Sequence, residues 1–211
     1  MAKINRLVVR KQIAKGFNSH SIRRLSLEAA EKRITRLKNE SLLEFKNHPV
    51  TRELKGGSGS PNLSNTLGGR GNLFSFIGFN EGEDPTAIVE MAINNVRINK
   101  TPRIREIGKS GKYEIEFTAT MPSVKELEAL TPMPFEKGRS WLTGIERGIS
   151  GLSYYIYSKM KDIKASRSGK GIQSDKPYIS GLRYKPVGYI SMVLKNLRSK
   201  LLRWKLNTKI K

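Results

Sequence analysis

Apolar residues recur along the chain with two different periods, one typical of helices and one of strands. Over residues 21–45 they follow helical spacing, at Leu27, Ala30, Ile34, Leu37 and Phe45. This spacing predicts a long helix with one apolar face. Proline disfavours a helical conformation at the residue before it, so Asn47-His48-Pro49 should end the helix.

Strict alternation of apolar and polar residues marks the middle of the chain as β-structure. Residues 96–107 and 112–120 alternate on either side of Gly108-Lys109-Ser110-Gly111, which predicts a β-hairpin. The clearest strand signal is Tyr113, Ile115, Phe117 and Ala119. Residues 72–79, NLFSFIGF, form an apolar run short enough to be a buried strand.

Helix start signals predict two short helices around the hairpin. Asp84-Pro85 is typical of an N-cap followed by a first-turn proline. It should open a helix to about residue 95, with Ile88, Met91 and Ala92 facing inward. Ser123-Val124-Lys125-Glu126 matches a capping box, so a helix should follow to Leu130.

Two longer helices are predicted towards the C-terminus. A central helix over residues 138–160 carries an apolar stripe, with Gly144, Gly148 and Gly151 along another face. Three glycines weaken a helix, so their expected role is the close approach of another backbone. The last helix, residues 187–206, is basic and amphipathic, with apolar residues at Ile190, Leu194, Leu197, Leu201 and Trp204.

These elements predict an α+β fold. We expect a small antiparallel sheet with a β-hairpin, packed by a long N-terminal helix, a central helix and a basic C-terminal helix. Residues 1–20 should form an irregular basic arm, residues 21–206 a single domain, and residues 207–211 a basic tail. The domain should carry a long Gly/Ser-rich loop at 55–71 and a basic loop at 161–186.

Charge is distributed unevenly along the chain. With 40 basic and 18 acidic residues among 211, the net charge is +22. Residues 1–55 carry +9, residues 56–150 carry no net charge, and residues 151–211 carry +13. Such a chain attracts polyanions, and the pattern indicates a neutral folded body with two basic ends.

Motifs for catalysis, metal binding and membrane insertion are absent from the sequence. The chain has no cysteine and no Gly-x-Ser-x-Gly, and Arg103 stands where a phosphate loop ending in Gly108-Lys109-Ser110 would need glycine. No apolar run is long enough to span a membrane. Helix-dipole stabilisation explains Glu81, Glu83 and Asp84 more simply than a metal site does. We therefore expect neither an enzyme nor a metal, a cofactor or a membrane partner.

The basic loop offers the first candidate contacts with a polyanion. Its lysines and arginines are interleaved with Tyr178 and Tyr184, so they could neutralise phosphates while the tyrosines stack on bases. A solvated charged loop fits the same residues. The candidate contact residues are Lys161, Lys164, Arg167, Lys170, Lys176, Arg183 and Lys185.

Three stretches resemble virion proteins of tailed bacteriophages, in particular the neck and tail-completion proteins of the head–tail interface. They are HPVTREL (48–54), NLSNTLGGRGNLFSFIGF (62–79) and PFEKGRSWLTGIERGISGLSYYIYSK (134–159), followed by SRSGKGIQ (166–173). In that family a Pro-Val-x-Thr-Gly-x-Leu turn commonly follows the first helix, and residues 49–54, PVTREL, keep its order without the glycine and the spacing.

The resemblance implies a structural subunit of a ring that joins portal to tail around the DNA channel. Its partners would be further copies of the chain, portal, neck and tail proteins, and double-stranded DNA, in a virion assembled in the host cytoplasm. The glycine-rich segments would then make inter-subunit contacts. The residues concerned are Gly57, Gly59, Asn62, Gly68, Gly69, Arg70, Gly144 and Gly148.

A second hypothesis is a nucleic-acid-binding protein of a ribonucleoprotein particle, similar to ribosomal proteins with basic extensions. Charge alone does not separate the two, because both place basic ends in polyanionic surroundings. The neutral, glycine-punctuated centre favours the protein ring, since an RNA binder more often carries basic residues on its folded body as well.

Overall fold

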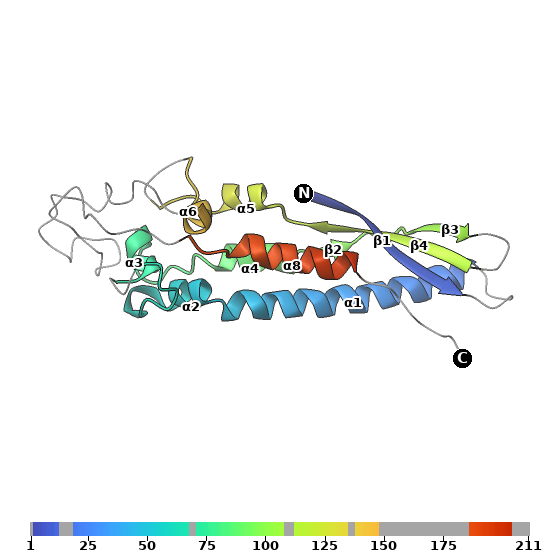
Figure 1. Cartoon of the computed structure of the whole chain (residues 1–211), viewed down its shortest axis with the longest axis horizontal. Coiled ribbons are helices and arrows are strands. Elements are labelled where there is room, and N and C mark those ends of the chain that lie inside the picture. Colours follow the sequence, from blue (N-terminus) through green and yellow to red (C-terminus); the bar gives the residue numbers. More distant parts are fainter. Residues whose placement is uncertain are drawn as a thin grey trace, which may run out of the picture. The chain divides into compact units, whose positions relative to one another are not determined.

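The computed structural model describes residues 2–12, 19–67, 71–107, 112–134, 138–147 and 186–203. The fold is α+β, as predicted (Figure 1). The chain divides into two compact units. Unit 1 comprises residues 1–42, 92–123 and 193–211, whereas unit 2 comprises residues 43–91 and 124–192. The predicted boundaries at residues 20 and 206 stay predictions.

Unit 1 contains an antiparallel sheet built around one long strand. The strands are β1 (Ala2–Gln12), β2 (Arg97–Ile98), β3 (Arg103–Ile107) and β4 (Lys112–Met121). β4 pairs with β1 along one edge and with β2 and β3 along the other. On one face of β4, Ile115, Phe117, Ala119 and Met121 are buried, which confirms the alternation seen in the sequence.

Within the predicted N-terminal arm, residues 2–12 form the strand β1, so the prediction of irregular structure was wrong for this part. β1 pairs with β4 from Ala2 opposite Met121 to Gln12 opposite Lys112. The register shifts between Ile4 and Leu7, where β1 has one residue more than β4, as in a β-bulge. The partner strand lies about a hundred residues away in sequence, so no local pattern in the arm announces the pairing.

The predicted hairpin is confirmed, but its first strand is interrupted. β3 and β4 pair up to Ile107 opposite Lys112, and the connecting residues 108–111 lie outside the described residues. Between β2 and β3, the side chain of Asn99 accepts a hydrogen bond from the N–H of Thr101 at 3.1 Å. Pro102 follows and has no N–H to donate to the sheet, which explains the break.

Helical segments complete the core of unit 1. Residues 19–42 of α1 (Ser19–Asn47), the end of α4 (Ala87–Asn94) and most of α8 (Ile190–Leu202) belong to it. The bounds of α1 confirm the long first helix, and its Ala30, Ile34 and Leu37 are buried. The last helix is confirmed over Ile190–Leu202, where Ile190, Leu194, Leu197 and Leu201 of the predicted stripe are buried. Trp204 lies outside the described residues.

Unit 2 is built from short helices. They are α2 (Pro49–Lys55), the 3-10 turn η1 (Gly57–Gly59), α3 (Leu73–Ile77), α5 (Val124–Leu130) and α6 (Trp141–Arg147). Phe79 packs beside Phe74 and, edge to face, against Trp141. α1 ends before Pro49 and α5 begins directly after Ser123, as predicted.

Within the apolar run at residues 72–79, Leu73–Ile77 form the helix α3, so the prediction of a buried strand was wrong. The side chain of Asn72 accepts a hydrogen bond from the N–H of Ser75 at 2.9 Å and caps α3. Gly78 ends the helix with φ of 88°, a left-handed conformation that glycine adopts without strain. Both ends of the apolar run are therefore fixed by helix caps, while Leu73, Phe74 and Ile77 are buried as expected.

Two further predictions need revision. In α4 the buried residues are Val89, Ala92 and Ile93, whereas Met91, which was expected to face inward, is 54% exposed. The central helix predicted over residues 138–160 begins at Trp141 and is described to Arg147. Its remainder and the basic loop predicted at 161–186 lie outside the described residues, apart from residue 186.

Candidate polyanion-binding surface

The structure concentrates the positive charge in one of the two units. Unit 1 holds 24 basic and six acidic residues, a net charge of +18, whereas unit 2 holds 16 and 12, a net charge of +4. Unit 1 takes residues 1–42 of the first basic end and residues 193–211 of the second, together with residues 92–123, whereas residues 43–55 and 151–192 belong to unit 2. Most of the excess positive charge therefore belongs to unit 1.

Helix α8 presents a basic surface without any acidic residue. The sequence from Val187 to the end of the chain contains no aspartate or glutamate. The apolar stripe of α8 faces the core, so Lys195, Arg198 and Arg203 point to solvent and are exposed. Within the described residues these three side chains make no ion pair or hydrogen bond. They are available for an external anion.

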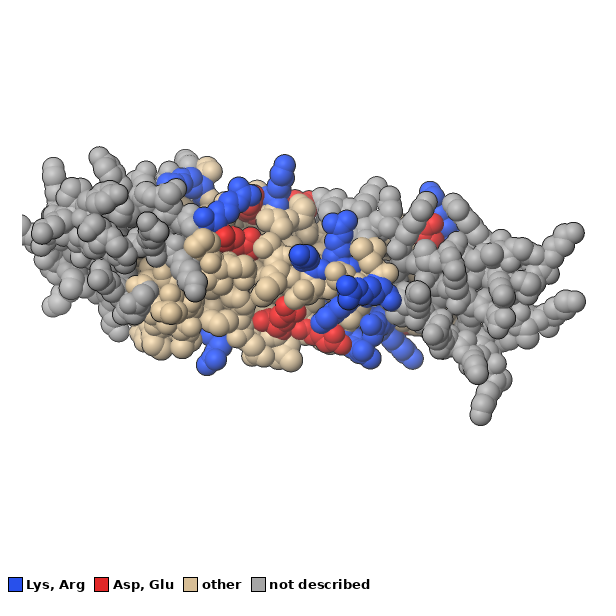
Figure 2. Space-filling view, viewed as in Figure 1, with Lys and Arg blue, Asp and Glu red and all other residues tan. Residues whose placement is uncertain are grey.

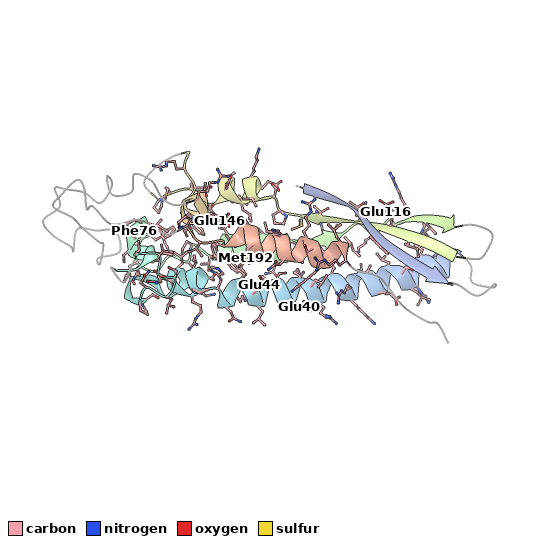
Figure 3. The ribbon with its side chains drawn as sticks, in the orientation of Figure 1. Glu40, Glu44, Phe76, Glu116, Glu146 and Met192 are labelled. Atoms are coloured by element: carbon pink, nitrogen blue, oxygen red, sulfur yellow. The ribbon has the colours of Figure 1, made fainter. Side chains whose placement is uncertain are left out.

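Helix α1 extends this basic surface within unit 1. Lys200 of α8 reaches Glu40 of α1, with Nζ and Oε2 3.3 Å apart, so the two helices lie side by side (Figures 1 and 3). Arg36 Nε donates to Glu40 Oε1 at 3.0 Å. These hydrogen bonds, from Lys200 first and Arg36 second, lower the pKa of the Glu40 carboxyl. Glu40 therefore stays ionised and holds two cations side by side.

The cations gather on the face shown in Figure 2, over α8 and the adjoining part of α1. On α1, Lys32 is exposed without an ion pair among the described residues, and Arg33 keeps its Nε buried without a hydrogen-bond partner in that part of the chain. We name the basic residues of these parts of α1 and α8, with the adjoining Arg203, the α8–α1 surface. It consists of Lys32, Arg33, Arg36, Lys195, Arg198, Lys200 and Arg203.

The basic-loop residues predicted from the sequence cannot be compared with this surface. All of them lie outside the described residues, namely Lys161, Lys164, Arg167, Lys170, Lys176, Arg183 and Lys185. Sequence analysis recognised the last helix as basic and amphipathic but did not single out its cations. The signal was present in the sequence, as a long acid-free segment with an apolar stripe that leaves the lysines and arginines on the opposite side.

The glycine-rich loop predicted to contact other subunits is held in place by a buried carboxylate. Glu53 of α2 is fully buried. Its Oε1 accepts hydrogen bonds from Asn62 Nδ2 at 2.8 Å and from the N–H of Leu73 at 2.7 Å. Its Oε2 accepts from the N–H of Ser64 at 2.8 Å. The two ends of the loop are thus joined through one side chain.

Asn72 fixes the other part of the loop. Besides capping α3, its Nδ2 donates to the carbonyl oxygens of Gly57, Ser58 and Ser60 at 3.3, 2.9 and 2.8 Å. Among the predicted inter-subunit residues, Asn62 is therefore used inside the chain and Gly57 lies in a tight turn with φ of 65°. Gly59 is exposed, as is Leu63 nearby, so this part of the loop presents a shaped outer surface.

The remaining predicted inter-subunit residues divide into two groups. Gly68, Gly69, Arg70 and Gly148 lie outside the described residues. Gly144 of α6 lies on the wall of a cavity of about 640 Å³ between α5 and α6. The charged residues on that wall are Glu128, Arg139 and Arg147, and Arg147 Nη2 lies 3.7 Å from Glu128 Oε1.

The carboxylates considered for a metal site make contacts within their own loop. Glu83 accepts hydrogen bonds from Asn80, and Asp84 Oδ1 accepts from the N–H and hydroxyl of Thr86 at 3.0 and 2.5 Å. Asp84 therefore forms the turn that leads into α4, while Glu81 is exposed. Within the described ranges, no cluster of three or more histidines and acids is arranged to hold a metal ion.

Of the two histidines, His48 has a defined structural role. It is the N-cap of α2, where Nδ1 accepts a hydrogen bond from the N–H of Val50 at 3.3 Å. Its ring packs on Tyr189 with 4.8 Å between centroids. Burial lowers the pKa of His48, although the Gly188 backbone and the carboxylates of Glu44 and Glu146, labelled in Figure 3, act in the opposite direction.

This contact makes stability depend on pH. The folded state favours neutral His48, so the unfolded chain binds a proton first as the pH falls below about 6.5. The stabilisation is complete above that pH and is lost as the pH falls through the lower pKa of the folded state. The unfolding temperature of the wild type should therefore decrease between pH 7 and pH 5.

The variant His48→Asn should remove most of this decrease, because asparagine caps a helix without titrating in this range. Thermal unfolding followed by circular dichroism at several pH values measures the effect, and His20→Asn is the control, since His20 is exposed on α1. An equal pH dependence in wild type and His48→Asn would contradict the role of His48.

Comparison with known proteins adds no relationship. No protein-family model matches the chain, and neither a curated protein nor a solved structure is significantly similar to it. Within the described residues, no helix is both long and apolar enough to cross a membrane.

Proposed function

We propose that this chain is a structural subunit of the head–tail connector of a tailed bacteriophage, in a neck or tail-completion ring around the DNA channel. The observation that carries the proposal is the concentration of charge, with +18 in unit 1 and +4 in unit 2. A subunit of a ring around DNA needs one part that faces a polyanion and another that contacts proteins. The strongly basic unit 1 suits the part that faces the polyanion, and the nearly neutral unit 2 suits the part that contacts proteins.

The stretches that resemble phage virion proteins support the same proposal. HPVTREL covers the His48 cap and α2, and NLSNTLGGRGNLFSFIGF covers much of the glycine-rich loop and α3. Glu53 and Asn72 hold these segments together, because their side chains make seven hydrogen bonds to residues of the loop and of α3. The described residues of these two stretches are thus held together by internal hydrogen bonds, which suits repeated contacts between identical subunits.

Exposed apolar side chains favour unit 2 as the protein-contacting part. Most of the large hydrophobic residues that are well exposed in the described chain belong to it, namely Leu43, Leu63, Met91, Leu130 and Met192. Contact with another protein would remove these side chains from water, which stabilises association. Unit 1 has Leu25 and Leu202 in this class.

The mass of the purified chain in solution tests the proposal. Native mass spectrometry should give closed oligomers with one dominant number of subunits, because cyclic symmetry closes a ring at a fixed number. A monomer that binds RNA in a salt-sensitive manner would contradict the connector and favour the ribonucleoprotein hypothesis.

A matched pair of variants tests whether unit 2 makes the contacts. Leu63→Asp, on the outer surface of the loop, should shift the oligomer towards monomers, because a charge is costly to bury in an interface. Leu25→Asp, at a similarly exposed position of unit 1, should leave the mass unchanged. The opposite result would place the subunit contacts on unit 1.

A further inference from the structure

We infer that the α8–α1 surface binds the phosphate backbone of double-stranded DNA, independently of base sequence. The inference rests on the proposed function, since it names the polyanion that unit 1 faces and the residues that contact it. It differs from the sequence-based prediction, which placed the polyanion contacts in residues 161–185.

The first argument is the number of cations without internal partners. Lys32, Lys195, Arg198 and Arg203 are exposed and make no ion pair within the described residues. Arg36 and Lys200 share one acid, Glu40, so this group of three keeps an excess positive charge. Within the described residues, Glu40 is the acid that pairs with these cations, so a dense external anion would relieve their remaining mutual repulsion.

The second argument separates nucleic acid from an acidic protein as the partner. The central parts of protein interfaces are depleted of charged residues, lysine especially, and enriched in aromatic and other apolar side chains. On the exposed side of α8 in unit 1 the large apolar residue is Leu202, which is 48% exposed. Lysine and arginine make up most of the other exposed residues on this side, as is typical of surfaces that contact phosphates.

The third argument favours duplex over single-stranded nucleic acid. From Lys195 to Leu202, α8 rises by about 10 Å, a length over which duplex DNA carries about six phosphate charges. Binding of single strands relies on aromatic side chains on which the bases stack. In the described part of unit 1, the α8–α1 surface contains no such side chain. The arrangement fits a rigid, regularly charged duplex.

Affinity for a duplex of arbitrary sequence, measured at several salt concentrations, tests the inference. The test variant replaces Lys195, Arg198 and Arg203 with glutamine, and the control makes the same change at Arg52, Lys55 and Lys125 of unit 2. All six residues are exposed, and both variants lose the same net charge. A third variant, with arginine at position 195 and lysine at positions 198 and 203, keeps the charge.

The test variant should bind about tenfold more weakly or worse near 0.1 M salt, and its salt slope should fall by about 0.9 for each phosphate that is no longer neutralised. The control and the charge-preserving variant should bind within about twofold of the wild type. Circular dichroism should show that all variants keep the wild-type fold, as expected for exposed positions.

Three outcomes would overturn the inference. They are equal losses of affinity in the test and control variants, no duplex binding by the wild type, and a clear preference of the wild type for single-stranded RNA. Because the oligomer mass is measured separately, a ring that does not bind DNA would remove this inference and leave the proposed function standing. A monomer that binds duplex DNA would contradict the proposed function and leave this inference standing.

Discussion

Replacing Glu53 with alanine should lower the free energy of unfolding by about 2–4 kcal/mol. The change leaves the N–H of Leu73 buried without an acceptor and removes one acceptor each from Asn62 and Ser64. An unpaired buried donor costs more than a neutral hydrogen bond contributes, because burial has also removed the donor from water. Since these bonds join α2, the loop and α3, all three should loosen together.

Urea unfolding followed by circular dichroism measures the loss of stability, and two further variants identify its cause. Glu53→Gln keeps the shape of the side chain but offers an amide N–H₂ where the N–H of Ser64 needs an acceptor. Its free energy of unfolding should therefore lie between those of Glu53→Ala and the wild type. Glu81→Ala removes an exposed carboxylate from the same unit and should change stability by less than about 0.5 kcal/mol. If Glu53→Ala were as stable as Glu81→Ala, Glu53 would not organise the loop.

Replacing Tyr189 with alanine should cost about 3–5 kcal/mol, the range for deleting a large buried aromatic side chain. Tyr189 is fully buried, and its ring stacks on Phe45 with 5.8 Å between centroids. Its hydroxyl hydrogen-bonds to Thr51 Oγ1 at 2.7 Å. Burial raises the pKa of this hydroxyl well above its usual range, so it stays protonated. Tyr189 thereby fixes the start of α8.

Tyr189→Phe separates packing from hydrogen bonding. It keeps the ring and leaves the Thr51 hydroxyl without this partner, so the expected loss of stability is about 1–2 kcal/mol. The double variant Tyr189→Phe with Thr51→Val should then cost little more than the single one. Urea unfolding of the three variants gives these differences, and a loss in Tyr189→Phe as large as in Tyr189→Ala would contradict the packing role.

The parts of the fold that were predictable have a long, regular pattern. The stripe of α1 extends over several turns, and the alternation in β4 places Ile115, Phe117 and Ala119 on one buried face. In such segments burial on one side determines the structure. The apolar run at residues 72–79 is too short to show a period, so its caps, Asn72 and Gly78, decide between strand and helix. Those caps are visible in the sequence.

The arrangement of charge could not be predicted in the same way. Which unit each end of the chain joins depends on contacts between residues distant in sequence, such as Ala2 with Met121 and Lys200 with Glu40. These contacts bring β1 and most of α8, which are distant in sequence, into unit 1. The role of Glu53 could not be predicted either, because its hydrogen-bond donors lie further along the chain. A single acidic residue on a short helix gives no sequence pattern that points to them.

An image of the assembly that contains this chain tests the central claim most directly. Electron microscopy of particles purified through a tag on the chain should show a closed ring of identical copies around an axial channel. The α8–α1 surface should face the polyanion, and the apolar side chains of unit 2 should lie between neighbouring subunits. A single copy of the chain embedded in an RNA-containing particle would contradict the connector function.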